Sequence, residues 1–172
     1  MRSTEFAQPA FLFLLFIIPL MIGFYIFYNL MYALFSYPLG ILSDKIGQKT
    51  LIVAGFILFS FVYFAYGFAG STIMFGLLFL VYGLYAAASE GISKALITNM
   101  VRKDDTATAL GFFNSFASVA TMAASSIGGL IWFAFSPQHM FVFSGIGVML
   151  TVIYLIAVFR RSYLKPTRDI GI

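Results

Sequence analysis

The sequence of 172 residues contains no cysteine and one histidine, His139. Disulfide frameworks, thiolate metal sites and cysteine nucleophiles are therefore excluded, and a lone histidine cannot hold a metal ion. The patterns G-x-S-x-G and H-E-x-x-H, a phosphate-binding loop and paired carboxylates within one apolar run are also missing. The sequence therefore predicts no enzyme activity, no metal site and no cofactor.

Charged residues are equally scarce. They make up 9% of the chain, whereas 62% is hydrophobic and 22 residues are phenylalanine. Soluble domains carry about 25% charged residues, so this composition excludes a soluble globule and predicts a protein embedded in the lipid bilayer. The formal net charge of +4 does not indicate nucleic acid as a partner, because most basic residues flank apolar runs, where the bilayer explains them.

What the chain has in abundance is long apolar runs. A spanning helix needs about 20 apolar residues, and five runs of this kind predict one all-α transmembrane domain over residues 1–172. Its helices are expected at about 10–42, 51–68, 72–99, 106–135 and 140–159, followed by a tail at 160–172. The first run is much longer than the bilayer is thick, so a tilt or a break at Pro19 is expected.

Basic residues lie almost entirely on one side of the predicted spans. Eight fall in the turns after the first and third runs and in the tail, and Arg2 alone falls on the other side; the eight are Lys45, Lys49, Arg102, Lys103, Arg160, Arg161, Lys165 and Arg168. Because positively charged loops stay in the cytoplasm, the chain should cross the inner (plasma) membrane of the cell with its N-terminus outside and its C-terminus in the cytoplasm.

A short charged turn separates the first two runs and extends from Gly40 to Lys49. Such a tight hairpin calls for glycine: Gly40 removes a side chain where backbones crowd, and Gly47 can adopt a positive φ. Asp44 is expected at the membrane edge, near the positive end of a neighbouring helix, with Lys45 and Lys49 among anionic headgroups. An alternative is an ordinary solvated turn with a helix cap.

This turn resembles the pattern G-x-L-[small]-D-[KR]-x-G-[KR]-[KR], which joins the second and third helices of each half of a major facilitator superfamily transporter. The resemblance implies a cytoplasmic gating loop, in which the aspartate latches one half of the transporter to the other; its residues here are Gly40, Asp44, Lys45, Gly47 and Lys49. Gln48 departs from the pattern, which usually has a cation there, so one charge of such a network is missing.

The resemblance covers nearly the whole chain. Residues 19–42 match the eighth helix of such a transporter and the later runs match its last four, which implies an incomplete C-terminal six-helix bundle. The implied function is transport of a small solute by alternating access, with H⁺ as a candidate coupling ion and an N-terminal half or a second copy as partner. The alternative is a truncated or structural membrane protein that assembles with partners but transports nothing itself.

The third run contains the intramembrane charges Glu90 and Lys94. They share one helix face with Gly76 and Gly83, because the spacings are built from steps of three and four residues. Small residues in lipid mark a close helix contact, so Glu90 is expected to point into the bundle. The pair could form a mutual ion pair near the cytoplasmic edge with a structural or gating role, or Glu90 could couple protons or ions.

Two further runs carry candidate residues. In the fourth run, two ladders of small residues that include Ala120, Ala124 and Gly128 predict a close helix contact, and Asn114 is a candidate for lining a cavity. In the first run, one face carries polar and aromatic side chains that could line a substrate path or form interhelical hydrogen bonds; these are Tyr25, Asn29, Tyr32 and Ser36.

Overall fold

The computed structural model describes the backbone of residues 3–164 and the side chains of residues 15–160. The described part is all-α, as predicted. Its elements are α1 (Ser3–Ile46), α2 (Gln48–Gly67), α3 (Thr72–Met100), the short 3₁₀ helix η1 (Lys103–Asp105), α4 (Thr106–Ala134) and α5 (Pro137–Leu164). Five of these helices are long and apolar enough to cross a membrane. The basic residues Arg2, Lys165 and Arg168, and most of the predicted tail, lie outside the described residues.

The helices extend further than hydropathy predicts at the turn between the first two helices. The first was expected to end at residue 42 and the second to begin at 51, yet α1 continues to Ile46 and α2 begins at Gln48. Backbone hydrogen bonds continue past the apolar core into the polar layer, which hydropathy does not register. The predicted break at Pro19 is wrong, because α1 is helical across this residue, as membrane helices tolerate when their surroundings satisfy the freed backbone groups.

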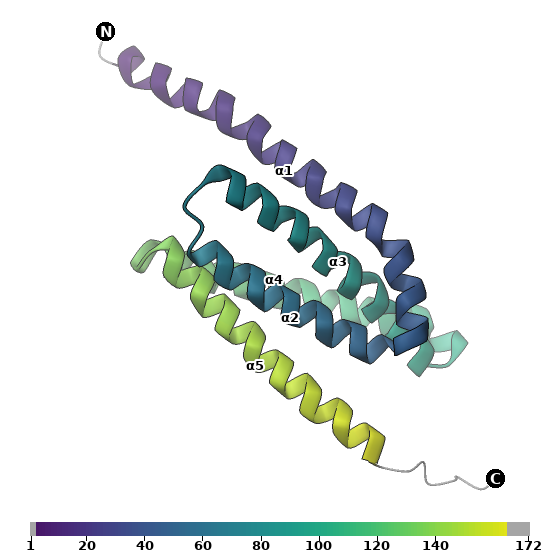
Figure 1. Ribbon diagram of the computed structural model, residues 1–172. Coiled ribbons are helices and arrows are strands. Elements are labelled where there is room, and N and C mark those ends of the chain that lie inside the picture. Colours follow the sequence, from purple (N-terminus) through teal and green to yellow (C-terminus); the bar gives the residue numbers. More distant parts are fainter. Residues whose placement is uncertain (1–2, 165–172) are drawn as a thin grey trace, which may run out of the picture.

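The helices are arranged in the spatial order α1, α3, α2, α5, with α4 behind them (Figure 1). Helix α3 packs against both α1 and α2, and α2 packs in turn against α5. Helix α4 makes smaller contacts, with α5 and α3. The N-terminal part of α1 extends beyond the other helices, which fits its 44 residues, or about 66 Å at the usual rise per residue.

The core of the described bundle lies along α2 and α3. One cluster contains Leu51, Ile52, Ala88 and Ile92, and a second contains Val62, Tyr66 and Leu78. Small residues bring the backbones close: a Cβ atom at Gly55 would lie 3.3 Å from the Cβ of Ala88. Helix α4 contributes no buried residue.

A hydrogen bond from Ser60 Oγ to the carbonyl oxygen of Gly145, 3.0 Å long, joins α2 to α5 inside the bundle. Both residues are buried. Interhelical hydrogen bonds of this kind stabilise membrane bundles by about 0.6 to 2 kcal/mol each. The bond therefore fixes the position of α5 beside the core helices.

Candidate functional site

The hairpin between α1 and α2 is a single-residue turn. Gly47 lies between α1 and α2 with a φ of 91°, in the left-handed region that favours glycine, and its N–H donates to the Ser43 carbonyl oxygen at 2.9 Å. The expectation for Gly40 is wrong, because a Cβ atom there would meet nothing within 4 Å. The hairpin is therefore tight at Gly47 alone, whose positive φ is readily adopted only by glycine.

Polar contacts around the hairpin join three helices at this end of the bundle. Gln48 Oε1 accepts a hydrogen bond of 3.3 Å from Asn99 Nδ2, near the end of α3. The Lys49 ammonium lies 5.3 Å from the ring centre of Phe159 on α5, in a cation–π geometry. Asp44 and Lys45 are exposed. Neither Asn99 nor Phe159 could be identified from the sequence, because both contacts join residues far apart in the chain.

The polar stripe on α1, defined as Tyr25, Asn29, Tyr32 and Ser36, faces outward from the described bundle. Tyr25, Asn29 and Ser36 are exposed, and Tyr32 is half-buried. Its hydrogen bonds stay within α1: Asn29 Nδ2 donates to the Tyr25 carbonyl oxygen at 2.7 Å, and Ser36 Oγ to that of Ala33 at 3.1 Å. Interhelical hydrogen bonding, one of the two alternatives for this stripe, is therefore not found among the described residues.

The glycines of α3 lie against α1, at the face where a close contact is expected. A Cβ atom at Gly76 would lie 3.0 Å from the Phe24 ring, and one at Gly83 would lie 2.7 Å from the Tyr28 carbonyl oxygen. Backbone packed this closely leaves room for no other residue at Gly83. The two helices are thus held together along the first half of α3.

Glu90 does not point into the bundle as predicted. It is exposed, as is Lys94, and these two described residues form no ion pair with each other. A Cβ atom at the neighbouring Gly91 would meet nothing within 4 Å, so the helix surface beside Glu90 is open. Glu90 lies four residues beyond Ala86, the middle of α3, or about 6 Å along the axis. It is therefore closer to the centre of α3 than to the C-terminal end of this helix.

Four tyrosine rings form a continuous row across α1 and α3. Ring centres are 6.1 Å apart for Tyr25 and Tyr28, 5.4 Å for Tyr28 and Tyr82, and 5.5 Å for Tyr82 and Tyr85. Phe59 of α2 stacks on Tyr85 from behind at 4.3 Å.

We call Tyr25, Tyr28, Tyr82 and Tyr85 the tyrosine row. Only Tyr25 of these was predicted as a site residue. Tyr82 and Tyr85 lie on α3 among other apolar residues, and nothing in their spacing distinguishes them from core aromatics. The row exists because Gly83 allows α1 to approach α3, which brings Tyr28 beside Tyr82.

The small-residue ladders of α4 do not make the predicted close helix contact within the described bundle. Ala120 and Ala124 are exposed, and a Cβ atom at Gly128 would come no closer than 3.8 Å to another side chain, that of Met140. A cavity of about 740 Å³ separates α4 from α2 and α5 instead, and Ala124 and Gly128 line it. Asn114, also on α4, is exposed.

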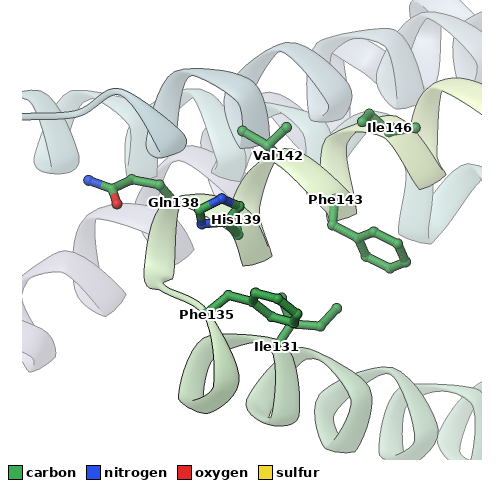
Figure 2. A pocket seen from close by; sticks show the side chains of 7 residues that line it. All are labelled: Ile131, Phe135, Gln138, His139, Val142, Phe143 and Ile146. Atoms are coloured by element: carbon green, nitrogen blue, oxygen red, sulfur yellow. The ribbon is translucent and has the colours of Figure 1, made fainter.

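A second, apolar cavity of about 560 Å³ lies where α4 turns into α5, and its lining includes Ile131, Phe135, His139 and Phe143. In Figure 2, Ile131 and Phe135 at the end of α4 lie across this cavity from the α5 residues. His139 Nδ1 lies 2.6 Å from Ser136 Oγ. Nowhere in the described part of the chain do three histidine, cysteine, aspartate or glutamate residues gather as a metal site would require.

The chain matches a known family along almost its whole length. The sequence profile of the Major Facilitator Superfamily matches residues 6–171. The chain is 35% identical over 156 residues to an uncharacterised MFS-type transporter of Methanocaldococcus jannaschii, an alignment that covers 91% of this chain and 38% of that protein. No solved structure matches.

Two further relatives have more specific names. A probable galactarate/D-glucarate transporter of Bacillus subtilis is 34% identical over 137 residues, which is 75% of this chain and 30% of the relative. A multi-drug resistance efflux pump of Streptococcus pneumoniae is 27% identical over 137 residues, which is 80% of this chain and 34% of the pump. The chain thus spans about a third of the length of the curated relatives it matches.

Proposed function

Since the chain belongs to the major facilitator superfamily, we propose that it takes part in transmembrane transport of a small solute, as one bundle of a secondary transporter. In such a carrier two bundles rock against each other and expose a central site to each side of the membrane in turn. This bundle would supply one wall of the path, and a further bundle or a second copy of the chain would supply the opposite wall.

The observation that carries this proposal is the position of Glu90. Its side chain is exposed about 6 Å from the middle of α3, and it makes no hydrogen bond or ion pair within the described residues. A charged side chain facing hydrocarbon at this depth is costly, so such residues usually face a water-filled cavity or another helix. The Glu90 face is therefore the face that the solute path would follow.

The polar stripe on α1 supports the same assignment. Its exposed groups bond only to their own helix, so they remain available for a solute. Asn114 offers a further exposed amide from α4. In this reading Glu90 binds the coupling ion, with H⁺ the candidate, and Lys94 lies about one helical turn nearer the cytoplasm as a gating charge.

The hairpin would act as the cytoplasmic latch. Asp44 and Lys45 are exposed at the end of α1 and could bind the end of a helix from the opposite bundle. This role places the hairpin in the cytosol. A cysteine introduced at Lys45, in a chain that has none of its own, should react with an impermeant maleimide only from the cytoplasmic side. Labelling only from outside would overturn this orientation.

A second candidate function is assembly with another membrane protein without transport. The uncovered α4, with no buried residue, favours this alternative, because a helix without close contacts is suited to a partner. The two functions differ in one measurable respect. An assembly protein needs its small-residue faces but has no need for the Glu90 carboxylate.

The test is a solute flux measurement on purified protein in lipid vesicles. Galactarate, D-glucarate and a drug-like dye are suitable first solutes, given the names of the relatives. Glu90→Gln should abolish gradient-driven flux while helical content and elution volume stay unchanged, and Asp104→Asn, at an exposed carboxylate of η1, should leave flux unaltered. Absence of flux with any solute, together with a silent Glu90→Gln, would favour the assembly function.

A further inference from the structure

We propose that the apolar cavity between the end of α4 and the start of α5 binds one acyl chain of a membrane phospholipid, and that His139 binds the phosphate of the same lipid. We call this space the α4–α5 cavity. Its volume of about 560 Å³ lies within the range of about 300–1,000 Å³ that is usual for small-molecule sites. Among the described residues, none of those that line it belongs to α1 or α3. The inference therefore goes beyond the proposed transport and does not depend on it.

Polarity changes along the α4–α5 cavity as it does along a lipid molecule. Gln138 and His139 lie at the start of α5, where this membrane span begins. The rest of the lining is apolar and consists of Ile131, Phe135, Val142, Phe143 and Ile146 (Figure 2). From Gln138 to Ile146 the lining extends about 12 Å along the axis of α5, which is close to the hydrocarbon thickness of one leaflet, about 15 Å. An extended acyl chain therefore fits the length of the cavity.

The surroundings of the cavity favour a lipid over water or a polar solute. Phe135 and Phe143 are 73% and 59% exposed, so the cavity is open to whatever surrounds these membrane helices. A buried water needs about two to four polar partners, and a polar solute would lose its hydrogen bonds against this lining. An acyl chain comes from hydrocarbon, so it loses no hydration on entry and gains packing contacts with two helices.

His139 provides a hydrogen-bond donor for the lipid phosphate. Ser136 Oγ accepts a hydrogen bond of 3.4 Å from the His139 N–H and lies 2.6 Å from His139 Nδ1. We assign the Ser136 hydroxyl proton to the second contact, which places the ring proton on Nε2. Nε2 has no hydrogen-bond partner within the described residues. It is therefore available to donate to a phosphate oxygen, whose negative charge strengthens the bond.

The charges of this part of the chain also suit a phosphate. From Thr106 to Phe159 the sequence contains no aspartate, glutamate, lysine or arginine. His139 is thus the only side chain in this stretch that can become positively charged, and no carboxylate of the same stretch competes for its proton or repels a phosphate. Phosphate binding here should therefore depend on His139.

The experiment uses Trp132, the only tryptophan of the chain, as its reporter. Trp132 follows Ile131 of the cavity lining, and its ring centre lies 6.1 Å from that of Phe141 on α5. Purified protein in detergent is titrated with phosphatidylglycerol whose acyl chains carry bromine, which quenches tryptophan fluorescence at short range. Diacylglycerol with the same brominated chains is the matched control without phosphate. We expect saturable quenching by the phospholipid and about tenfold weaker binding of the diacylglycerol.

Two variants test the two ends of the site separately. Ile146→Phe fills the inner end and should weaken binding of both lipids by about fivefold. Ile153→Phe makes the same change about two turns further along α5, outside the cavity lining, and should change nothing. His139→Ala should weaken phospholipid binding by about tenfold and leave diacylglycerol binding within about twofold.

The variants are placed where folding is expected to tolerate them. Ile146 and Ile153 are 48% and 59% exposed, and His139 is exposed. Circular dichroism checks the helical content of each variant, and the comparison of the two lipids on the wild type needs no variant.

Two results would overturn the proposal. One is quenching that rises in proportion to the brominated lipid without saturation and is the same in Ile146→Phe, because lipid would then only surround the protein. The other is equal binding of phospholipid and diacylglycerol together with a silent His139→Ala, because the phosphate would then have no partner at His139.

Discussion

Helices α2 and α4 are both long, apolar and rich in small residues, yet they lie in opposite environments. In α2, seven residues are buried, among them Ile52, Val62 and Tyr66, whereas α4 has none over its 29 residues. Composition therefore does not say which membrane helix is central. In lipid the driving force is close packing rather than escape from water, so burial depends on the presence of a partner with a matching surface.

The glycines of α3 and α4 also differ in whether another helix packs against them. Gly83 of α3 is pressed against the α1 backbone, whereas a Cβ atom at Gly129 of α4 would meet nothing within 4 Å. Small residues thus mark helix surfaces that another helix can approach closely. Whether such a contact forms depends on the presence of a helix with a matching surface. Stability measurements can test this contrast, because each variant in the packed region has a counterpart of the same chemistry in an open one.

The largest effect is expected at Gly83. Gly83→Ala would place a Cβ atom 2.7 Å from the Tyr28 carbonyl oxygen, so α1 must move away, at a cost of about 2 kcal/mol in the free energy of unfolding. Gly91→Ala, on the same helix with nothing within 4 Å, should have little effect. Unfolding by sodium dodecyl sulfate, followed by circular dichroism in detergent, measures both. Equal effects would show that α1 and α3 do not pack as described.

A moderate effect is expected at Val62, which is 0% exposed. Val62→Ala leaves a void between α2 and its neighbours and should destabilise the protein by about 1.5 kcal/mol. Val119→Ala makes the same change on α4, where the side chain is 62% exposed, and should be almost silent. The same unfolding assay compares them. A large loss at Val119 would mean that α4 is covered by another chain under the assay conditions.

The smallest effect is expected at Ser60. Ser60→Ala removes the interhelical bond to Gly145 and should reduce the free energy of unfolding by about 0.6 kcal/mol. Ser126→Ala is the counterpart on α4, because Ser126 Oγ bonds the Met122 carbonyl oxygen of its own helix. This counterpart should change stability less. If Ser126→Ala destabilises the protein more than Ser60→Ala does, the hydrogen bond from Ser60 does not hold α5 in place.

Much of the fold could be predicted from the sequence, because a membrane helix is coded locally by length and apolar composition. Five candidate spans among the described residues, and the superfamily, are confirmed. The hairpin turn at Gly47 could also be predicted from the sequence, since a turn this short requires one residue at positive φ. The predicted helix ends were less accurate. Hydropathy detects only the apolar part of a helix, whereas backbone hydrogen bonds continue into the polar residues beyond it.

The candidate site was less predictable, because it depends on contacts between helices. Glu90 shares a helix face with Gly83, but periodicity could not show that Gly83 is packed against α1 while Glu90 is exposed. The tyrosine row needs α1 and α3 side by side before Tyr28 meets Tyr82. The ladder on α4 was recognised, but its residues were expected to touch a helix where the described bundle has a cavity.

The most direct test of the proposed carrier asks which exposed face of the bundle meets water. Single cysteines at Asn29 and Ser36 on the polar stripe, and at Ile57 and Phe61 on the exposed apolar face of α2, can be labelled in native membranes with a charged maleimide. We expect rapid reaction at Asn29 and Ser36 and almost none at Ile57 and Phe61. Protection of both stripe positions, as complete as at Phe61, would contradict a water-filled solute path along this face.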